Sequence, residues 1–284
     1  MKIAIYGPGG IGSTFAFHLS RAGHDVTVIA RGKRLAQLTE DGAIVDVKGT
    51  RTPVTVNGTL DTSVPYDLLL VTVLEWQLPA VLPAVKASAA KQVMFMFNTF
   101  DSLQPLREAV GAERFTFGFP AIIATLPEGR LQSHVVTVGQ HTLATDAKWA
   151  EVFTRAGIPT DVHEDIQSWL RTHAVLIGVL MSLAVDAFTR KAGAQWKDAR
   201  RAALAVREGF SLTRELGSRV TPAPMGALGW LPVPMVSGLF WAMSRLRLIQ
   251  SLGAAGASEP DALLTSMTRL SPKTALLESL KSTH

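Results

Sequence analysis

The sequence predicts an α/β fold, with an N-terminal Rossmann-type, doubly wound sheet followed by an all-α C-terminal domain. In the first half, short apolar runs alternate with segments of helical periodicity, as in a parallel sheet with crossover helices. A glycine-rich turn joins the first predicted strand to the first predicted helix. From about residue 165 onward, long helical patterns replace the strand patterns. We therefore expect two domains, at residues 1–164 and 165–284.

The predicted elements of the first half follow from periodicity and from turn residues. In chain order they are a strand at 2–6, a helix at 12–22, a strand at 25–30, a hairpin formed by 43–47 and 53–56, a buried strand at 67–74, a helix at 78–90 and a buried strand at 92–97. Less regular strand patterns follow at 117–124 and 130–138. Continuous apolar strands of this kind are typical of the inside of a parallel sheet.

Long helices dominate the second half, where we predict helices at 169–191 and 195–216 and two or three more near the end. The apolar stretch 174–185 is shorter than the roughly twenty residues that cross a bilayer. A second stretch, 225–243, is interrupted by Pro232 and Pro234. We expect both to be buried and predict no membrane partner. The alternative is a peripheral membrane contact through residues 230–241, because exposed apolar patches mark partners.

Composition narrows the class of protein. Hydrophobic residues make up 47% of the 284 residues and charged residues 18%, a balance that excludes a disordered chain. Cysteine is absent, which removes disulfides, thiolate metal sites and cysteine nucleophiles and fits a cytoplasmic location. The N-terminus has no long apolar run of the kind that a secretory signal needs. The net charge of +5 comes from scattered basic residues without a nucleic-acid motif, so we expect no nucleic-acid partner.

The glycine-rich turn reads Gly7-Pro8-Gly9-Gly10-Ile11-Gly12, which satisfies G-x-G-x-x-G between a strand and a helix. In this context Gly7 permits the tight turn, Gly9 lets a pyrophosphate approach the backbone, and Gly12 lets the helix pack close to the strand. The helix N-terminus offers N–H groups and a positive dipole end to phosphates. The segment predicts a dinucleotide site, with a strand–helix turn that binds nothing as the alternative.

The end of the second predicted strand indicates which dinucleotide binds. NAD-binding units usually have an acidic residue about twenty residues past the glycines, where it accepts a hydrogen bond from the ribose 2′-OH. This chain has Arg31 there, followed by Lys33 and Arg34. A guanidinium binds a 2′-phosphate with a planar fork of donors, whereas an acid would repel it. We therefore predict NADP(H) as the cofactor, with a solvated basic loop as the alternative.

Asn98 follows the buried strand at 92–97, so we expect it at the carboxyl edge of the sheet, where ligands bind. There an Asn amide can donate to a carbonyl oxygen or orient the nicotinamide ribose. The alternative is an Asx-type turn, since Thr99, Asp101 and Ser102 follow. The histidines show no spacing that pairs metal ligands, and we predict no metal site.

With the glycine loop, Arg31, the strand 68–73 and Asn98 taken together, the chain resembles the ketopantoate reductase (2-dehydropantoate 2-reductase) family. The domain order resembles that family over nearly the whole chain, but specific motifs lie only in the first domain. The resemblance implies NADPH-dependent reduction of a ketone or 2-keto acid in a cleft between the domains. Because hydride reaches the carbon and a proton must reach the oxygen, a general acid is needed.

The resemblance fails at the family's catalytic positions. The lysine of its Trp-x-Lys segment falls on Arg171 or on His173, depending on the alignment, and a further lysine is replaced by Leu74. Arg171 stays protonated and suits a carboxylate clamp, whereas His173 titrates near neutral pH and suits a proton donor. Two residues apart, they cannot share a helix face. Glu259 is the nearest counterpart of the family's catalytic glutamate, and a poor one.

We therefore predict an NADP-dependent reductase of a 2-keto acid or ketone, 2-dehydropantoate or a related substrate, with altered specificity. The expected catalytic groups are Arg171 as substrate anchor, His173 as proton donor and Asn98 as a polar group at the cofactor. The alternative is a catalytically lapsed NADP(H)-binding sensor, because an intact phosphate loop stands beside an eroded proton-transfer site. The apolar helices of the second half are compatible with a homodimer interface or with a core.

Overall fold

The computed structural model describes residues 1–247, 249 and 258–281. The described chain divides into two compact units. One comprises Met1–Asn98 and Leu103–Ile166, and the other comprises Thr99–Ser102 and the chain from Gln167 onward. The all-α second half agrees with the predicted fold class, and the domain boundary at residue 164 stays a prediction. The short excursion of Thr99–Ser102 into the helical unit was not expected.

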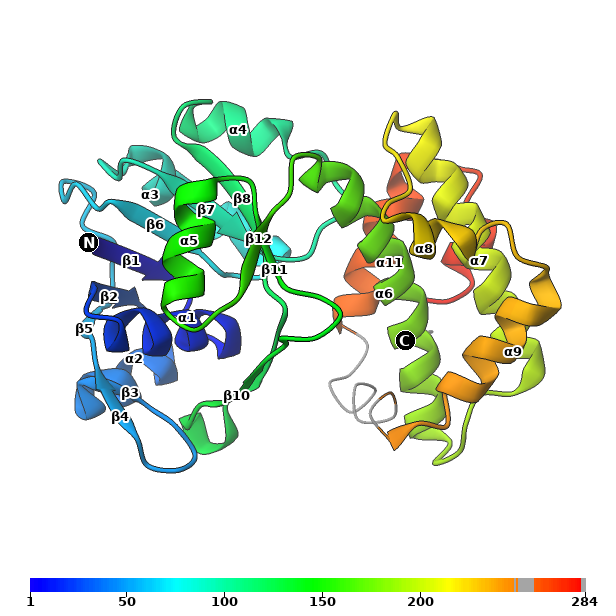
Figure 1. Ribbon diagram of the computed structural model, residues 1–284, viewed down its shortest axis with the longest axis horizontal. Helices are drawn as coiled ribbons and strands as arrows, with labels where there is room; N and C mark the ends of the chain where they lie inside the picture. Colours follow the sequence, from blue (N-terminus) through cyan, green and yellow to red (C-terminus); the bar gives the residue numbers. More distant parts are fainter. Residues whose placement is uncertain (248, 250–257, 282–284) are drawn as a thin grey trace. The chain divides into compact units, whose positions relative to one another are not determined.

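An eight-stranded sheet forms the centre of the first unit, in the order β12-β11-β8-β7-β6-β1-β2-β5 (Figure 1). The strands are β1 Lys2–Tyr6, β2 Asp25–Ile29, β5 Thr55–Asn57, β6 Leu68–Val71, β7 Val93–Met96, β8 Phe115–Phe119, β11 Thr142–Ala144 and β12 Thr160–Val162. Pairing from β5 to β8 is parallel, whereas β11 runs antiparallel to β8. Because β1 pairs with both β2 and β6, the strand order reverses at β1, and ligands bind such sheets at this point.

Helices cover the sheet because its strands are apolar on both faces. The helices of this unit are α1 Gly10–Arg21, α2 Gly32–Asp41, α3 Leu78–Ala87, α4 Gln104–Val110 and α5 Ala147–Arg155. Phe15 of α1 and Phe153 of α5 meet edge to face, with ring centroids 4.9 Å apart, over alternate residues of β1 and β2. This packing fixes the N-terminal end of α1 beside the end of β1, so the glycine loop is held on a rigid support.

Three short strands depart from the predicted pattern. The expected hairpin is β3 Ala43–Val45 with β4 Arg51–Pro53, while the following residues form β5 at the edge of the main sheet. The single strand expected at 117–124 breaks after Phe119, and β9 Ile122–Thr125 pairs instead with β10 Gln132–Val135. Pro120 explains the break, because a proline supplies no N–H to a ladder.

The helical unit is built around the apolar helix α6, Ile166–Thr189, and α7, Trp196–Glu215. Shorter helices follow at α8 Ala223–Ala227, α9 Val233–Met243, α11 Ser258–Leu270 and α12 Ala275–Glu278. By length and composition α6 passes as a membrane-spanning helix, but Ala174, Val175 and Val179 are fully buried in the helical core. We therefore describe α6 as a core helix of this unit.

Candidate functional site

A cavity of about 610 Å³ lies in the first unit at the carboxyl ends of β1, β2 and β6, where the strand order reverses. Seventeen residues line it: Tyr6, Gly7, Pro8, Gly9, Gly10, Ile11, Ile29, Ala30, Arg31, Arg34, Thr72, Val73, Leu74, Gln77, Ala80, Val81 and Leu126. The volume is that of a typical small-molecule site. The cavity therefore combines the expected phosphate loop with the expected basic segment.

Close packing explains why the loop needs glycine at its two ends. Gly7 has a φ of +92°, and a Cβ there would lie 2.6 Å from Cγ1 of Val73. A Cβ on Gly12 would lie 2.5 Å from the carbonyl oxygen of Gly7 and from Oγ1 of Thr72. A Cβ on Gly9, by contrast, would meet nothing within 4 Å. Gly7 and Gly12 thus hold the loop against the sheet, whereas Gly9 keeps its outer side open.

The first turn of α1 has no side-chain cap, because its N-cap residue is Gly9. It also contains no acidic residue. First-turn N–H groups of a helix have no partner within the helix. A phosphate is attracted both by these groups and by the helix dipole. This end of α1 thus has the features of an anion site, and it faces the cavity through Gly9, Gly10 and Ile11.

Arg34 holds the loop in place, a role that sequence reasoning missed. Its Nε donates to the carbonyl of Pro8 at 3.0 Å, and its Nη2 donates to Oγ of Ser13 at 2.8 Å. Nη1 donates to the carbonyl of Gly129 and to Oε1 of Gln37. Burial lowers the pKa of Arg34, and the nearby Asp41 opposes that shift. With four donor contacts made inside the protein, Arg34 is a positioning residue.

Arg31 differs from Arg34 because most of its donors face outward. Its side chain is exposed, its Nη2 donates to the hydroxyl of Tyr6 at 2.9 Å, and its guanidinium lies 5.8 Å from the centre of the Tyr6 ring. Tyr6 therefore orients the guanidinium at the cavity wall without using all of its N–H groups. This is the arrangement that a phosphate-binding arginine needs.

Leu74 also lines the cavity and is 41% exposed. Its backbone N–H donates to Oε1 of Gln77 at 3.1 Å. Thr72 fixes the end of β6 by donating its hydroxyl to the carbonyl of Gly7 at 2.8 Å. Thr72 and Gln77 are site residues that sequence reasoning did not select, although their place just after a buried strand was visible.

Asn98 lies two residues beyond β7 and is partly buried. Its Oδ1 atom is buried and has no hydrogen-bond partner among the described residues. Such an atom is costly to leave unsatisfied, so an unpaired one points to a ligand or water that the protein takes up. Within the described chain the lining of the cavity does not include Asn98. Its predicted role at the nicotinamide stays a prediction.

Arg171 is buried inside the helical unit, with 7% of its surface exposed. Its Nε donates to the carbonyl of Phe100 at 3.2 Å, and its Nη1 donates to the carbonyl of Leu216 at 3.1 Å and to Oγ of Ser218 at 2.8 Å. The guanidinium is thus engaged by uncharged groups that it holds together. Nε and Nη1 are engaged within the helical unit, and the role of Arg171 as substrate anchor stays a prediction.

His173 stacks on Trp169, with the ring centres 4.7 Å apart and the planes 11° from parallel. Burial lowers the pKa of His173 to about 4. At neutral pH the imidazole is therefore uncharged, although the predicted proton donor is an imidazolium. A neutral imidazole accepts a proton, which is the chemistry of the reverse, alcohol-oxidising direction. The pKa of His173 thus lies below its ordinary value near 6.5, and the role of His173 as proton donor stays a prediction.

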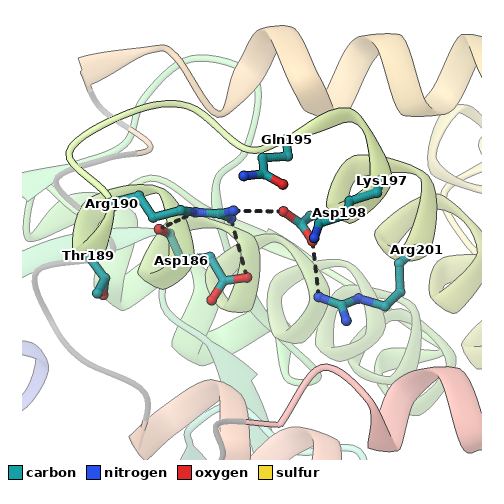
Figure 2. A pocket seen from close by; sticks show the side chains of 7 residues that line it. All are labelled: Asp186, Thr189, Arg190, Gln195, Lys197, Asp198 and Arg201. Carbon is teal, nitrogen blue, oxygen red and sulfur yellow. Dashed lines mark hydrogen bonds and ion pairs between the residues drawn. The ribbon is translucent and has the colours of Figure 1, made fainter.

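A second cavity, also of about 610 Å³, lies in the helical unit (Figure 2). Figure 2 shows Arg190 between two carboxylates, with Nη1 2.9 Å from Oδ2 of Asp198 and Nη2 3.7 Å from Oδ2 of Asp186. Arg201 pairs with the other oxygen of Asp198 at 3.3 Å. Arg190 and Arg201 pair with the carboxylates as in a structural ion-pair network, and Lys197 adds one further positive charge to the lining. This cavity lacks the glycine loop that makes the first cavity a phosphate site.

Comparisons with known proteins agree with the geometry of the first cavity. The family model described as ketopantoate reductase PanE/ApbA matches residues 3–146, about half of the chain. The 2-dehydropantoate 2-reductase of Vibrio cholerae is 32% identical over 138 residues, which cover 47% of this chain and 42% of the relative. The enzyme of the same name from Pyrococcus horikoshii is 26% identical over 180 residues, covering 60% and 58%. The chain thus spans about half the length of the curated relatives that it matches.

Solved structures extend the likeness of the fold to both units. A PanE/ApbA family ketopantoate reductase from Ralstonia eutropha superposes with a TM-score of 0.75 at 18% identity, covering 99% of this chain and 96% of the other. D-mandelate dehydrogenase in complex with NADH superposes with a TM-score of 0.74 at 17% identity and with the same coverage. Identities this low show the fold alone. With the family model matching the segment that carries the glycine loop, this chain belongs to the PanE/ApbA ketopantoate reductase family.

Proposed function

We propose that this protein is an NADP(H)-dependent reductase of a ketone or 2-keto acid. The observation that carries the proposal is the first cavity, which brings the N-terminus of α1 and the exposed Arg31 to the reversal point of the sheet. A dinucleotide bound there would place its diphosphate on Gly9, Gly10 and Ile11 and its 2′-phosphate on Arg31. When bound, the cofactor would supply the hydride. Gly7, Pro8 and Gly12 shape the loop that receives it.

Support for a 2-keto acid comes from the relatives. Three curated relatives are named 2-dehydropantoate 2-reductase, after the reduction of 2-dehydropantoate at carbon 2. The ternary structure of D-mandelate dehydrogenase contains NADH and anilino(oxo)acetate, which carries an oxo group next to an acyl carbon. We propose a substrate of the same class, a small 2-oxo acid or amide, and leave 2-dehydropantoate as one member to be tested. The division of labour that we propose is cofactor on the first unit and substrate specificity on the helical unit.

Two observations support a substrate specificity that differs from that of the relatives. Leu74 brings an apolar side chain to the cavity wall where the family has a lysine. Arg171, which takes the aligned lysine position under one alignment, is engaged inside the helical unit. Neither position presents the cation that a carboxylate partner would require. We therefore expect substrate binding in this protein to depend less on a carboxylate than the binding of 2-dehydropantoate by the relatives does.

The test is turnover of NADPH with a panel of 2-oxo acids, their amides and simple ketones, run in both directions. Oxidation of NADPH with at least one member supports the proposal, and Asn98→Ala is then expected to lower kcat/KM about 10- to 100-fold while the free protein keeps its melting temperature. NADPH binding without turnover of any member would indicate the catalytically lapsed sensor instead. No binding of either dinucleotide would contradict both functions.

We further propose a cytoplasmic location, since a chain without cysteine is suited to a reducing compartment. As its binding partner we propose a small keto substrate, and we propose no nucleic-acid partner. A homodimer through the helical unit is the remaining proposal on assembly, and light scattering at micromolar concentration decides it.

A further inference from the structure

Exposed apolar side chains gather on one side of α9 and on the residues that flank this helix. They are Trp230, Leu231, Met235, Leu239 and Leu246. Trp230 is 80% exposed and Met235 is 59% exposed. The one polar side chain in the described stretch 230–243 is Ser237, which is fully buried and donates to the carbonyl of Val233. We call this surface the α9 face.

An exposed helix normally carries charged or polar groups on its solvent side. On α9, Met235 and Leu239 are four residues apart and both are exposed, and the exposed Leu231 directly precedes the N-cap of this helix. Monomeric soluble proteins rarely expose a contiguous apolar patch of this kind unless it meets a partner. The α9 face thus has the character of a binding surface.

Two arginines of α7 border the α9 face. The guanidinium of Arg214 lies 5.7 Å from the ring centre of Trp230. Arg207 donates to the carbonyl of Leu231. Between Leu216 and Ser258, the segment that contains α9, the sequence has three arginines and neither aspartate nor glutamate. The segment that carries the apolar side chains is therefore positively charged, and arginines of α7 lie at its edge.

The positive charge around the α9 face and the length of α9 together indicate which partner binds this surface. An anionic lipid surface offers apolar depth for the leucines and negative charge for the arginines, and tryptophans are enriched at that interface. With 11 residues, α9 is about half as long as a helix that crosses a bilayer, so it would lie in the surface and not span it. A second copy of the chain fits less well, because a two-fold contact would bring the same positively charged segment against itself.

We propose that the α9 face docks this protein on an anionic bilayer surface, with Trp230, Met235 and the leucines in the acyl boundary and the bordering arginines at the lipid phosphates. The inner leaflet of the cytoplasmic membrane presents such charge. The inference replaces the expectation of no membrane partner. It does not depend on the proposed reductase activity, because the α9 face lies in the helical unit and the dinucleotide cavity in the other.

The experiment is flotation of the whole protein with vesicles of phosphatidylcholine alone and with vesicles in which about one third of the lipid is phosphatidylglycerol. We expect binding to the anionic vesicles to be about tenfold stronger or more, and to weaken as salt rises. The variant Met235→Glu with Leu239→Glu places two carboxylates on the α9 face and is expected to abolish flotation. Val47→Glu with Val138→Glu, at exposed positions of the first unit, is the matched control and is expected to float like the wild type.

Circular dichroism melting shows that each variant is folded, and light scattering without lipid reports the second-copy outcome. Failure of the wild type to float with anionic vesicles overturns the proposal, as does equal binding to neutral ones. A wild-type dimer that the α9 variant converts to a monomer, with no flotation of either, assigns the face to a second copy and also overturns the proposal. Flotation lost only in the α9 variant supports it.

Discussion

Arg171 and Phe100 are 71 residues apart in the chain, and the Nε of Arg171 donates to the carbonyl of Phe100 across 3.2 Å. The guanidinium also lies 5.8 Å from the centre of the Phe100 ring, which is fully buried in the helical core. Asp101, the next residue, accepts hydrogen bonds from Ser266 and Arg269. The segment that follows Asn98 is therefore anchored by side chains of the helical unit.

The first prediction concerns this anchor. Arg171→Met removes the donors of two carbonyls, and each buried carbonyl left without a partner costs about 1–3 kcal/mol. We expect the free energy of unfolding in urea to fall by about 2–5 kcal/mol, with NADPH affinity unchanged. Arg269→Met, whose side chain is 65% exposed, is the control and should cost less than about 1 kcal/mol. Unchanged stability with a raised KM for the keto substrate would support Arg171 as the substrate anchor.

The second prediction separates two glycines of one loop. Gly9 has a φ of −69° and open space where a Cβ would stand, so Gly9→Ala should leave the melting temperature unchanged. The added methyl group faces the phosphates, and we expect NADPH affinity to fall at least about tenfold. Gly12→Ala instead meets backbone 2.5 Å away and should lower the melting temperature. Calorimetry and thermal melting of both variants check this, and a matching loss of stability in Gly9→Ala would contradict it.

The third prediction concerns the choice of dinucleotide. A charge-assisted hydrogen bond contributes about 1.5–3 kcal/mol, so Arg31→Gln should weaken NADPH binding about 10- to 100-fold. NADH lacks the 2′-phosphate, and its affinity should hardly change. Lys33→Gln, exposed in the same segment, should change NADPH affinity less than about threefold. Isothermal titration measures all four combinations, and equal losses for both dinucleotides would remove Arg31 from the phosphate.

The fourth prediction follows from the pKa of His173, which burial lowers to about 4 from an ordinary value of about 6.5. Between these values the unfolded chain binds a proton that the folded protein does not. Above about pH 6.5 the imidazole is neutral in both states, so it does not change the free energy of unfolding. As the pH falls from about 6.5 to about 4, only the unfolded chain takes up the proton, and the free energy of unfolding decreases.

The lost stability amounts to about 3 kcal/mol at the acid end of that window. His173→Asn removes the titrating group, so the variant should lose about 3 kcal/mol less than the wild type between neutral pH and about pH 4. Urea unfolding at several pH values measures the difference. Parallel curves for the two proteins would show that His173 titrates normally in the folded state.

The phosphate loop was predictable from the sequence because its determinants are local. G-x-G-x-x-G between a strand and a helix defines a backbone shape, and the distances around Gly7 and Gly12 show how little room that shape leaves. The position of Arg31 at this edge of the sheet was predictable for the same reason, since Arg31 lies two residues after β2, the strand next to β1. Where one local pattern determines the geometry, a single sequence suffices.

The roles of Arg34 and Arg171 were not predictable, because their partners lie far away in the chain. Arg34 reaches Gly129, 95 residues on, and Arg171 reaches Ser218, 47 residues on. A basic residue near a glycine loop and one in a segment aligned with a catalytic lysine both indicate contact with a ligand. Only the fold shows the backbone carbonyls to which the two guanidinium groups donate.

The excursion of Thr99–Ser102 has a consequence for any attempt to separate the two halves. A fragment that begins at Gln167 would lack the aromatic ring of Phe100, which belongs to the buried cluster of the helices. Loss of a buried phenylalanine costs about 3–5 kcal/mol, a large share of the stability of a small domain. Cutting the polypeptide at Ile166 would thus leave a hole in the centre of the second half, and a short peptide spanning residues 99–102 would be needed to fill it.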